Sequence, residues 1–311
     1  MANILVTGSR GTIGGPLVQE LVKRGHCVKQ LDLQHCEEPN CIRADISEYR
    51  QLERIFEQEF DFVFHLAAEF GRINGEEYYE QVWRTNVIGT RNILELQKKH
   101  RFKLIFTSSS EIYGESGEVV LREEHSQTQA LFQHNDYAIS KWVNELQIIN
   151  FEKKFETETV RVRLFNAYGP GEYYHPYRSV VCLFCYRALH NLPFQVYKNY
   201  HRVFMFIDDL IPTLANIVDR FIPGRVYNIG GNEYRSVEEL ADLVLEYSGA
   251  SRDLIQLLPE DAHNTVNKYP EITKAEIELG HSPRILLEEG VPKTLEWMKN
   301  VYRETTIFSK V

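Results

Sequence analysis

The sequence predicts an α/β fold, a doubly wound parallel sheet with a smaller, mixed C-terminal lobe. Three observations lead to this prediction: short apolar runs alternate with helical patterns through the first half, a glycine-rich turn joins the first run to the first helix, and the second half is less regular. A chain of 311 residues with 43% hydrophobic side chains buries enough surface to need no disulfide or metal ion for stability.

The elements of the first half follow one another in a regular order. Five apolar runs have the length of buried strands, and they centre on residues 4–6, 28–33, 62–64, 104–106 and 160–164. Patterns with helical spacing lie between or after these runs, at 13–22, 76–99 and 137–155. Parallel sheets of this kind bind ligands beyond the carboxyl ends of their strands, which is where we expect the functional residues.

The second half begins where Gly169-Pro170-Gly171 interrupts the alternation. Helical patterns follow at 177–190, 209–220, 236–247 and 287–300. The third begins with a capping box, because Ser236 is followed three residues later by Glu239. We expect residues 1–166 to form the first domain, with about 203–230 returning to it, and 167–311 to form mainly a discontinuous second lobe.

Charge and hydropathy narrow the range of partners. The formal net charge of −9 argues against binding to nucleic acid or to an anionic membrane, since both need a basic face. The chain has no run of 18 apolar residues that could span a membrane. Its first strand begins almost at Met1, which leaves no room for a secretory signal, so we expect a cytoplasmic protein.

The five cysteines are scattered, and their odd number does not suggest a disulfide framework. Cys182 and Cys185 lie in an apolar stretch with no second pair to complete a metal site. We therefore expect two half-buried cysteines on a helix, and no metal ion.

The glycine-rich turn, Gly8-Ser9-Arg10-Gly11-Thr12-Ile13-Gly14, follows the first strand and opens the first helix. Glycines at such a turn let the backbone approach a pyrophosphate, which then faces the free N–H groups of the helix N-terminus. The spacing alone is a weak signal, but its place between a strand and a helix is a strong one. The sequence thus predicts a Rossmann-type dinucleotide site.

Two carboxylates mark the other end of the predicted dinucleotide. Asp32 ends the second apolar run, where a carboxylate can accept hydrogen bonds from the adenosine ribose and repel a 2′-phosphate. This favours NAD over NADP, although Arg10 in the glycine turn could reach a 2′-phosphate. Asp45 can contact the adenine or cap the helix expected from about residue 48.

A tyrosine and a lysine, Tyr137 and Lys141, share one face of the predicted 137–155 helix. A nearby cation stabilises phenolate, so we expect Lys141 to lower the pKa of Tyr137 toward that of a general base. The spacing carries little information, since about one such pair arises by chance in a chain of this composition. The hydroxyl-rich segment 107–110, at the carboxyl end of the fourth main strand, supplies the context.

These motifs resemble those of the extended short-chain dehydrogenases/reductases, in the NAD-dependent epimerase/dehydratase group. The resemblance covers nearly the whole chain. Its remaining pieces, in order, are His65-Leu66-Ala67-Ala68 and the segments 85–90, 163–171, 202–209, 227–231, 279–283 and 287–290.

The resemblance implies a role for each matching residue. Ser109 would be the catalytic hydroxyl, Tyr137 the base and Lys141 a ligand of the nicotinamide ribose. NAD would lie against Gly8, Arg10, Gly11, Thr12, Ile13, Gly14, Asp32, Asp45, Ile46, Leu66, Ala67, Ala68, Thr107, Tyr137 and Lys141. A nucleotide sugar, held mainly by the second lobe, would contact Glu69, Ser109, Ser110, Asn166, Arg178 and Arg202.

The first step that the resemblance implies is oxidation of the sugar at C4, after which the C5 proton becomes acidic. Glu111, two residues after Ser109, stands where dehydratases and UDP-glucuronate decarboxylases carry a glutamate. We therefore expect a nucleotide-sugar 4,6-dehydratase with Glu111 as the C5 base. The alternatives are a 4-epimerase, a UDP-glucuronate-type decarboxylase, a 4-dehydrogenase and, from another class, a non-catalytic NAD-sensing scaffold.

Three segments depart from the family pattern, namely 132–136, 172–178 and 197–201. All three border the nucleotide and sugar pockets of relatives, so they leave the sugar and the base of the substrate open. The resemblance also implies a homodimer, in which the helices at 76–99 and 137–155 pack as a four-helix bundle.

Overall fold

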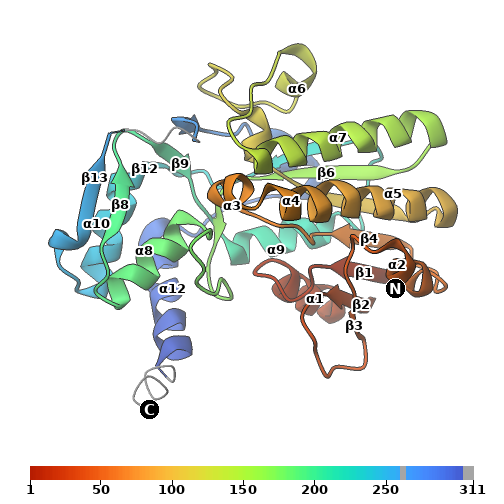
Figure 1. Ribbon diagram of the computed structural model, residues 1–311, viewed down its shortest axis with the longest axis horizontal. Helices are drawn as coiled ribbons and strands as arrows, with labels where there is room; N and C mark the ends of the chain where they lie inside the picture. The colour runs from red at the N-terminus through yellow and green to blue at the C-terminus, as the bar shows by residue number, and fades with distance from the viewer. Residues whose placement is uncertain (260–263, 304–311) are drawn as a thin grey trace.

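The computed structural model describes residues 1–259 and 264–303, and its centre is a parallel sheet (Figure 1). Seven strands run in the order β11-β6-β5-β4-β1-β2-β3. They are β1 (Asn3–Thr7), β2 (Cys27–Asp32), β3 (Cys41–Arg43), β4 (Phe62–His65), β5 (Lys103–Ser109), β6 (Thr159–Leu164) and β11 (Val226–Ile229). The order reverses at β1, as in a doubly wound sheet, so the predicted fold class is confirmed.

Side chains of each strand alternate between two apolar layers, which is why helices cover both faces of the sheet. In β1, Leu5 packs with one layer, while Ile4 and Val6 pack with the other. The first layer is completed by α2 (Tyr49–Ile55), α5 (Gly89–His100) and α7 (Asp136–Phe155). The second is completed by α1 (Gly14–Lys23) and α9 (Ile207–Asn216) (Figure 1).

The long helix predicted at 76–99 is broken into shorter pieces. The structure has α3 (Arg72–Glu77), α4 (Tyr79–Val82), a π-helical segment from Trp83 to Ile88, and then α5. Two side chains of the π-helical segment reach outward: Trp83 Nε1 donates to Asp136 Oδ1 at 2.9 Å, and Asn86 Nδ2 donates to Ser140 Oγ at 3.0 Å. The wider turn, common at functional sites, thus ties this helix to the start of α7.

The second lobe packs α8 (Val180–Leu189), α10 (Val237–Ser248) and α12 (Leu287–Tyr302) against one another. Ser236 and Glu239 form the predicted capping box at the start of α10. Small sheets complete the lobe: β8 (Phe194–Tyr197) with β13 (Ile255–Leu258), and β9 (His201–Val203) between β12 (Tyr234–Ser236) and β14 (Asn267–Lys268). The remaining elements are β7 (Ala167–Tyr168), β10 (Met205–Phe206), α6 (His125–Thr128) and α11 (Thr273–Leu279).

The cysteines differ in part from expectation. Cys36 and Cys41 form a disulfide, because the turn after β2 brings residue 36 back to the first residue of β3, with the Cα atoms 6.1 Å apart. Cys182 and Cys185 are free thiols on α8, as predicted, but they are fully rather than half buried. Across the described residues, no helix is both long and apolar enough to cross a membrane.

Candidate active site

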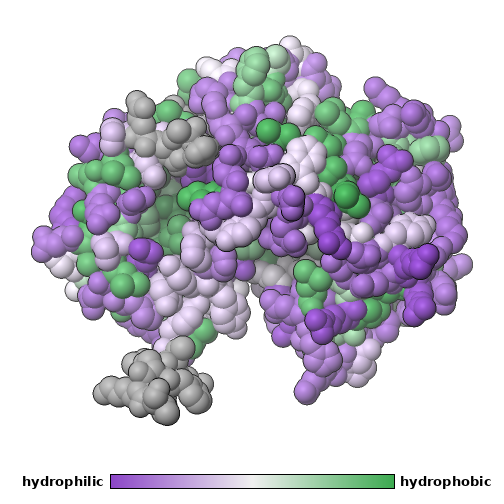
Figure 2. Space-filling view, in the orientation of Figure 1, coloured by the Kyte–Doolittle hydropathy of each residue, from purple (hydrophilic) through white to green (hydrophobic). Residues whose placement is uncertain are grey.

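A cavity of about 870 Å³ opens at the carboxyl ends of the central strands, between the sheet and the second lobe. Figure 2 shows the hollow where the two halves of the molecule meet. Nearly every residue that the sequence predicted for the site lines this cavity, from Gly8 at one end to Arg202 at the other. The exception is Arg10, whose side chain is exposed and outside the lining.

The glycine turn at the start of the cavity is too tight for side chains. A Cβ at Gly8 would lie 2.7 Å from the amide nitrogen of Ala67, and one at Gly14 would lie 2.1 Å from the carbonyl oxygen of Gly8. Gly8 also has φ +69°, a conformation that favours glycine. The bare backbone and the N-terminus of α1 therefore form the cradle that a dinucleotide pyrophosphate needs.

Asp32 sits beside this turn at the end of β2. Its Oδ2 accepts a hydrogen bond from the amide of Arg10 at 2.9 Å, and its Oδ1 accepts one from the amide of Gln34 at 3.0 Å. The carboxylate is thereby fixed at this end of the cavity, with lone pairs left to accept further hydrogen bonds. Asp45 caps the next turn, since its Oδ1 accepts from the amide of Ser47 at 2.8 Å.

A buried polar row supports the floor of the cavity at the ends of β1 and β4. Thr7 Oγ1 lies 2.8 Å from His65 Nδ1 and accepts from the amide of Ala67 at 3.2 Å, while His65 Nε2 lies 3.1 Å from Thr90 Oγ1. Burial, with a smaller contribution from the charge of Lys141, lowers the pKa of His65 to about 3. The imidazole is therefore neutral near pH 7 and acts as a hydrogen-bonded strut.

The residues predicted to be catalytic meet at the end of β5 and the first turns of α7. Ser109, the last residue of β5, hydrogen-bonds the phenol of Tyr137, as expected for a hydroxyl and base that share one substrate atom. Lys141 Nζ donates to the main-chain oxygen of Thr107 at 2.9 Å. All three side chains line the same cavity, so the structure brings the predicted constellation together.

The pKa of Tyr137 differs from the sequence prediction. Burial raises it to about 12, and the hydrogen bond from Ser109 offsets only part of this effect. Lys141 does not lower it here, because the ammonium is directed to the Thr107 carbonyl. Burial also lowers the pKa of Lys141 to about 8, against the opposing charge of Glu145. In this arrangement the phenol of Tyr137 is protonated at neutral pH. Lys141 is the nearby cation that could lower the pKa of Tyr137 if its ammonium turned toward the phenol.

Close packing fixes the position of Tyr137 on its helix. A Cβ at Gly75 would lie 2.7 Å from the amide nitrogen of Tyr137, so α3 approaches α7 as closely as two backbones can. Ser140 Oγ donates to the carbonyl of Tyr137 at 2.7 Å and accepts from Asn86, whose amide group also bonds both main-chain groups of Glu69. Asn86 thus links the helix that carries Tyr137 to the main chain of Glu69 at the cavity wall.

A fully buried ion pair lies behind the serines at the end of β5. Glu145 and Arg163 are both 0% exposed and 2.7 Å apart, and Glu145 Oε1 also accepts from Ser108 Oγ at 2.6 Å. Arg163 donates further to Tyr113 and Ser126. Burial raises the pKa of Glu145, but Arg163 and its neighbours outweigh this and hold the pKa below its ordinary value.

A second ion pair lies in front of the serine, inside the cavity. Lys268 Nζ, from β14, pairs with Glu111 Oε1, and their side chains are 3% and 16% exposed. Burial raises the pKa of Glu111, but Lys268, Arg72 and Arg202 together hold it below its ordinary value. Glu111 is therefore an ionised carboxylate beside Ser109 and Tyr137.

The remaining predicted substrate residues lie along the same wall. Arg202 donates to the carbonyl oxygens of His201 and Val266, both at 2.7 Å, which fixes its guanidinium at the cavity wall. Asn166, at φ +40°, donates to the carbonyl of Val203 at 2.9 Å. Arg178 stacks 4.0 Å above the ring of Phe70, so the aromatic segment 172–178 contacts the first domain across the cavity.

Comparison with known proteins places this geometry in a family. Residues 4–230 match the NAD dependent epimerase/dehydratase family, which is well over half of the chain. The chain belongs to this family. The UDP-N-acetyl-alpha-D-glucosaminuronate decarboxylase of Bacillus cytotoxicus is 29% identical over 96% of the chain and 98% of its own length. The putative UDP-glucose 4-epimerase of Methanocaldococcus jannaschii is 30% identical over 96% and 98%.

A solved family structure agrees with this assignment. An epimerase from Methanothermobacter thermautotrophicus has a TM-score of 0.90 and 27% identity, covering 99% of this chain and 95% of its own. The cofactor of this family member is NAD, and the cradle at Gly8 and Gly14 fits the pyrophosphate of a dinucleotide. The cofactor that the sequence favoured is therefore confirmed.

The sequence did not predict several residues that line the cavity of this protein. Lys268 and Arg72 face Glu111, and Glu172 is a buried carboxylate of the second lobe. Lys268 stands 157 residues from Glu111 in the chain and belongs to no motif, so only the fold could reveal the pair. Within the described residues, no cluster of three or more His, Cys, Asp or Glu side chains could hold a metal ion.

Proposed function

We propose that this enzyme is a nucleotide-sugar 4,6-dehydratase. The observation that carries the proposal is an ionised Glu111 in the same cavity as the hydrogen-bonded Ser109 and Tyr137. Oxidation alone needs only the hydroxyl and the phenol, whereas removal of the C5 proton needs a second base. A carboxylate at this place supplies it.

The residues divide the reaction between them. Ser109 holds the C4 hydroxyl while the phenolic oxygen of Tyr137 takes its proton, and bound NAD⁺ supplies the hydride acceptor. The carbonyl at C4 makes the C5 proton acidic, and the Glu111 carboxylate takes it and passes it to the C6 hydroxyl, which leaves as water. The hydride would then return to C6, with a proton going to C5, so that the net change is the loss of one water. Tyr137 must lose its proton for the first step, so the pKa of about 12 has to fall when the site fills, and Lys141 is the cation that can lower it.

The comparisons support the substrate class more firmly than the outcome. The named relatives act on UDP-linked sugars, and a dTDP-glucose 4,6-dehydratase of Streptomyces niveus is 25% identical over 96% of this chain and 93% of its own length. We propose that residues 167–311, with their cations Arg178, Arg202 and Lys268, mainly bind the nucleotide sugar, and that 1–166 with 203–230 mainly bind NAD.

A mass measurement distinguishes the possible outcomes. The enzyme is incubated with UDP-, GDP-, CDP- and dTDP-hexoses and with UDP-glucuronate, and the masses of the products are measured by mass spectrometry. Loss of one water is the expected result. An unchanged mass with an altered sugar would mean a 4-epimerase, loss of two hydrogens with free NADH would mean a 4-dehydrogenase, and NAD binding without any reaction would mean a sensing scaffold.

The Glu111→Gln variant tests the base directly. We expect it to lower the rate of elimination by about 10²–10⁴-fold, the usual contribution of a positioned base, while transient NADH absorbance still forms. The retained NADH signal is the internal control, because it shows that the fold, the cofactor and the Tyr137 step are intact. Full turnover in this variant would rule out Glu111 as the base.

A decarboxylase is the second candidate, and one observation favours it. Three cations, Lys268, Arg72 and Arg202, act on Glu111, and they could also hold a carboxylate at sugar C6. Loss of carbon dioxide from UDP-glucuronate in the mass measurement would select this reaction instead.

We further propose a homodimer in which α5 and α7 of two subunits pack together. Ile88 and Leu146, in the π-helical segment and α7, are 52% and 47% exposed, which leaves apolar surface for such contact. Sedimentation velocity is expected to give twice the mass of the chain, and charged substitutions at both positions should shift the protein to monomer.

A further inference from the structure

We propose that Lys268 is a displaceable partner of Glu111, which the anionic diphosphate of the substrate takes over on binding. When Lys268 changes its partner from Glu111 to the diphosphate, the Glu111 carboxylate becomes free, and this happens only when the substrate is bound. The inference rests on the proposed function in one respect, namely that the ligand carries a nucleoside diphosphate.

The position of the pair is the first step of the argument. Both side chains line the cavity, yet Lys268 is almost completely buried at 3% exposure, and Glu111 is 16% exposed. Within residues 1–259 and 264–303, Glu111 is the only carboxylate that forms an ion pair with Lys268. A lone buried pair of this kind is costly to break unless a new counter-charge arrives.

The neighbouring cation is held differently, which identifies the lysine as the group that can change partner. Arg202, the register partner of Lys268 between β9 and β14, has its guanidinium fixed by main-chain carbonyls of His201, Thr265 and Val266. A lysine ammonium has three donors on a flexible stem, and here one of them is known to meet Glu111. Lys268 can therefore turn to a second anion while Arg202 stays in place.

The charges around Glu111 explain why a bound diphosphate would displace it from Lys268. Arg72 from α3, Arg202 from β9 and Lys268 from β14 act on the carboxylate, and the carboxylate in turn acts on the phenol of Tyr137 from α7. A diphosphate brings two negative charges to these cations, so it competes with Glu111 for them and repels it. The carboxylate released from Lys268 stays in the cavity that Ser109 and Tyr137 also line.

A double-mutant cycle on binding, which needs no turnover, tests the exchange. The NAD-loaded protein is titrated by calorimetry with UDP, dTDP, GDP and CDP, and the nucleoside diphosphate that binds most tightly is carried forward. Wild type, Glu111→Gln, Lys268→Met and the double variant are compared. Lys268→Arg keeps the charge, and Lys274→Met removes a lysine that pairs with glutamates outside the cavity.

Competition predicts a definite pattern of affinities. Glu111→Gln should bind the diphosphate about 3- to 10-fold more tightly than wild type, and Lys268→Met about 10-fold more weakly, in the range of a lost ion pair. In the Lys268→Met background, Glu111→Gln should strengthen binding much less, because only the repulsion and the shared Arg72 and Arg202 remain. Lys268→Arg should recover most of the affinity, and Lys274→Met should leave it unchanged.

Two results would overturn the inference. If Glu111→Gln leaves affinity unchanged or weakens it, the carboxylate does not compete for the lysine. If it strengthens binding equally with and without Lys268, simple repulsion is at work and no exchange occurs. Absence of binding by all four nucleoside diphosphates would instead contradict the proposed substrate class, so the two failures are distinguishable.

Discussion

Two buried ion pairs stand on opposite sides of the serine row at the end of β5, and they are built differently. Behind the row, Glu145 and Arg163 are completely enclosed, and Ser108, Tyr113 and Ser126 add hydrogen bonds to them. In front of it, Glu111 and Lys268 face the cavity with few other partners.

The difference indicates that the Glu145–Arg163 pair has a structural role, whereas the Glu111–Lys268 pair can take part in ligand binding. A buried pair whose remaining donors and acceptors are all satisfied gives a fixed framework, and removing one partner leaves an uncompensated charge. A pair at the wall of a cavity can exchange one partner for a ligand. We therefore expect substitutions behind the serine row to change stability, and substitutions in front of it to change binding and rate.

The largest effect on stability is expected from Glu145→Gln. This change leaves Arg163, and Arg161 at 3.8 Å, without their buried carboxylate, so the free energy of unfolding should fall by about 3–5 kcal/mol. Urea denaturation measures it. Glu152→Gln, on the same helix and partly exposed, is the matched control and should cost less. A larger loss in Glu111→Gln than in Glu145→Gln would break the comparison.

A smaller effect, visible only in the pH dependence, is expected from His65. The folded pKa of about 3 lies below the unfolded value near 6.5, so the unfolded state binds a proton first as pH falls. This histidine alone should remove about 2 kcal/mol of unfolding free energy between pH 7 and pH 5. In His65→Gln that part of the slope should vanish, whereas the exposed His134→Gln should keep it.

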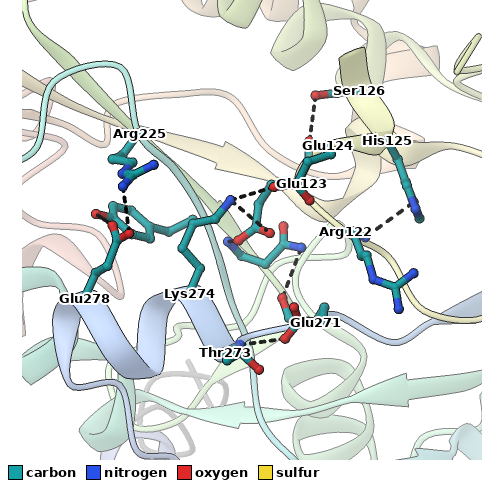
Figure 3. A network of polar contacts seen from close by, with 12 residues as sticks. Arg122, Glu123, Glu124, His125, Ser126, Arg225, Glu271, Thr273, Lys274 and Glu278 are labelled. Atoms are coloured by element: carbon teal, nitrogen blue, oxygen red, sulfur yellow. Dashed lines mark hydrogen bonds and ion pairs between the residues drawn. The ribbon is translucent and has the colours of Figure 1, made fainter. Parts of the chain in front are cut away.

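The smallest effect is expected in a third cluster of ionic contacts, away from the cavity (Figure 3). Lys274 Nζ lies 2.9 Å from Glu124 and 3.4 Å from Glu123, and its side chain is 24% exposed. Solvent screens such contacts, so Lys274→Met should lower the free energy of unfolding by about 1 kcal/mol or less. A loss as large as that of Glu145→Gln would show that exposure does not separate the two kinds of pair.

The sequence was informative where the site is built from contiguous segments. The turn from Gly8 to Gly14, the serines after β5 and the Tyr137–Lys141 pair each lie within one strand end or helix, so local patterns predict them. The break between α3 and α5 was missed, because the buried positions of this chain keep intervals of three and four residues through the π-helical segment. Lys268 was missed because its partner is distant in the chain and a lone lysine carries no pattern.

The charge state of Tyr137 could not be predicted from spacing either. Four residues of helix place Lys141 on the same face as Tyr137, but they do not decide where the ammonium turns. Its hydrogen bond to Thr107, and the burial of both side chains, depend on the strand beneath and on the packing of Gly75 against α7. Electrostatic properties of this kind emerge only from the tertiary structure.

The place of β11 in the sheet has a consequence for how the chain is made. β6 leaves the ribosome with β5 as its only strand neighbour, and its other edge stays open until β11, which ends at Ile229, has been synthesised. Through that interval the nascent sheet exposes a strand that is buried in the finished protein, and such edges pair readily with other chains. A fragment cut at residue 166 would keep this open edge permanently, so we expect it to aggregate.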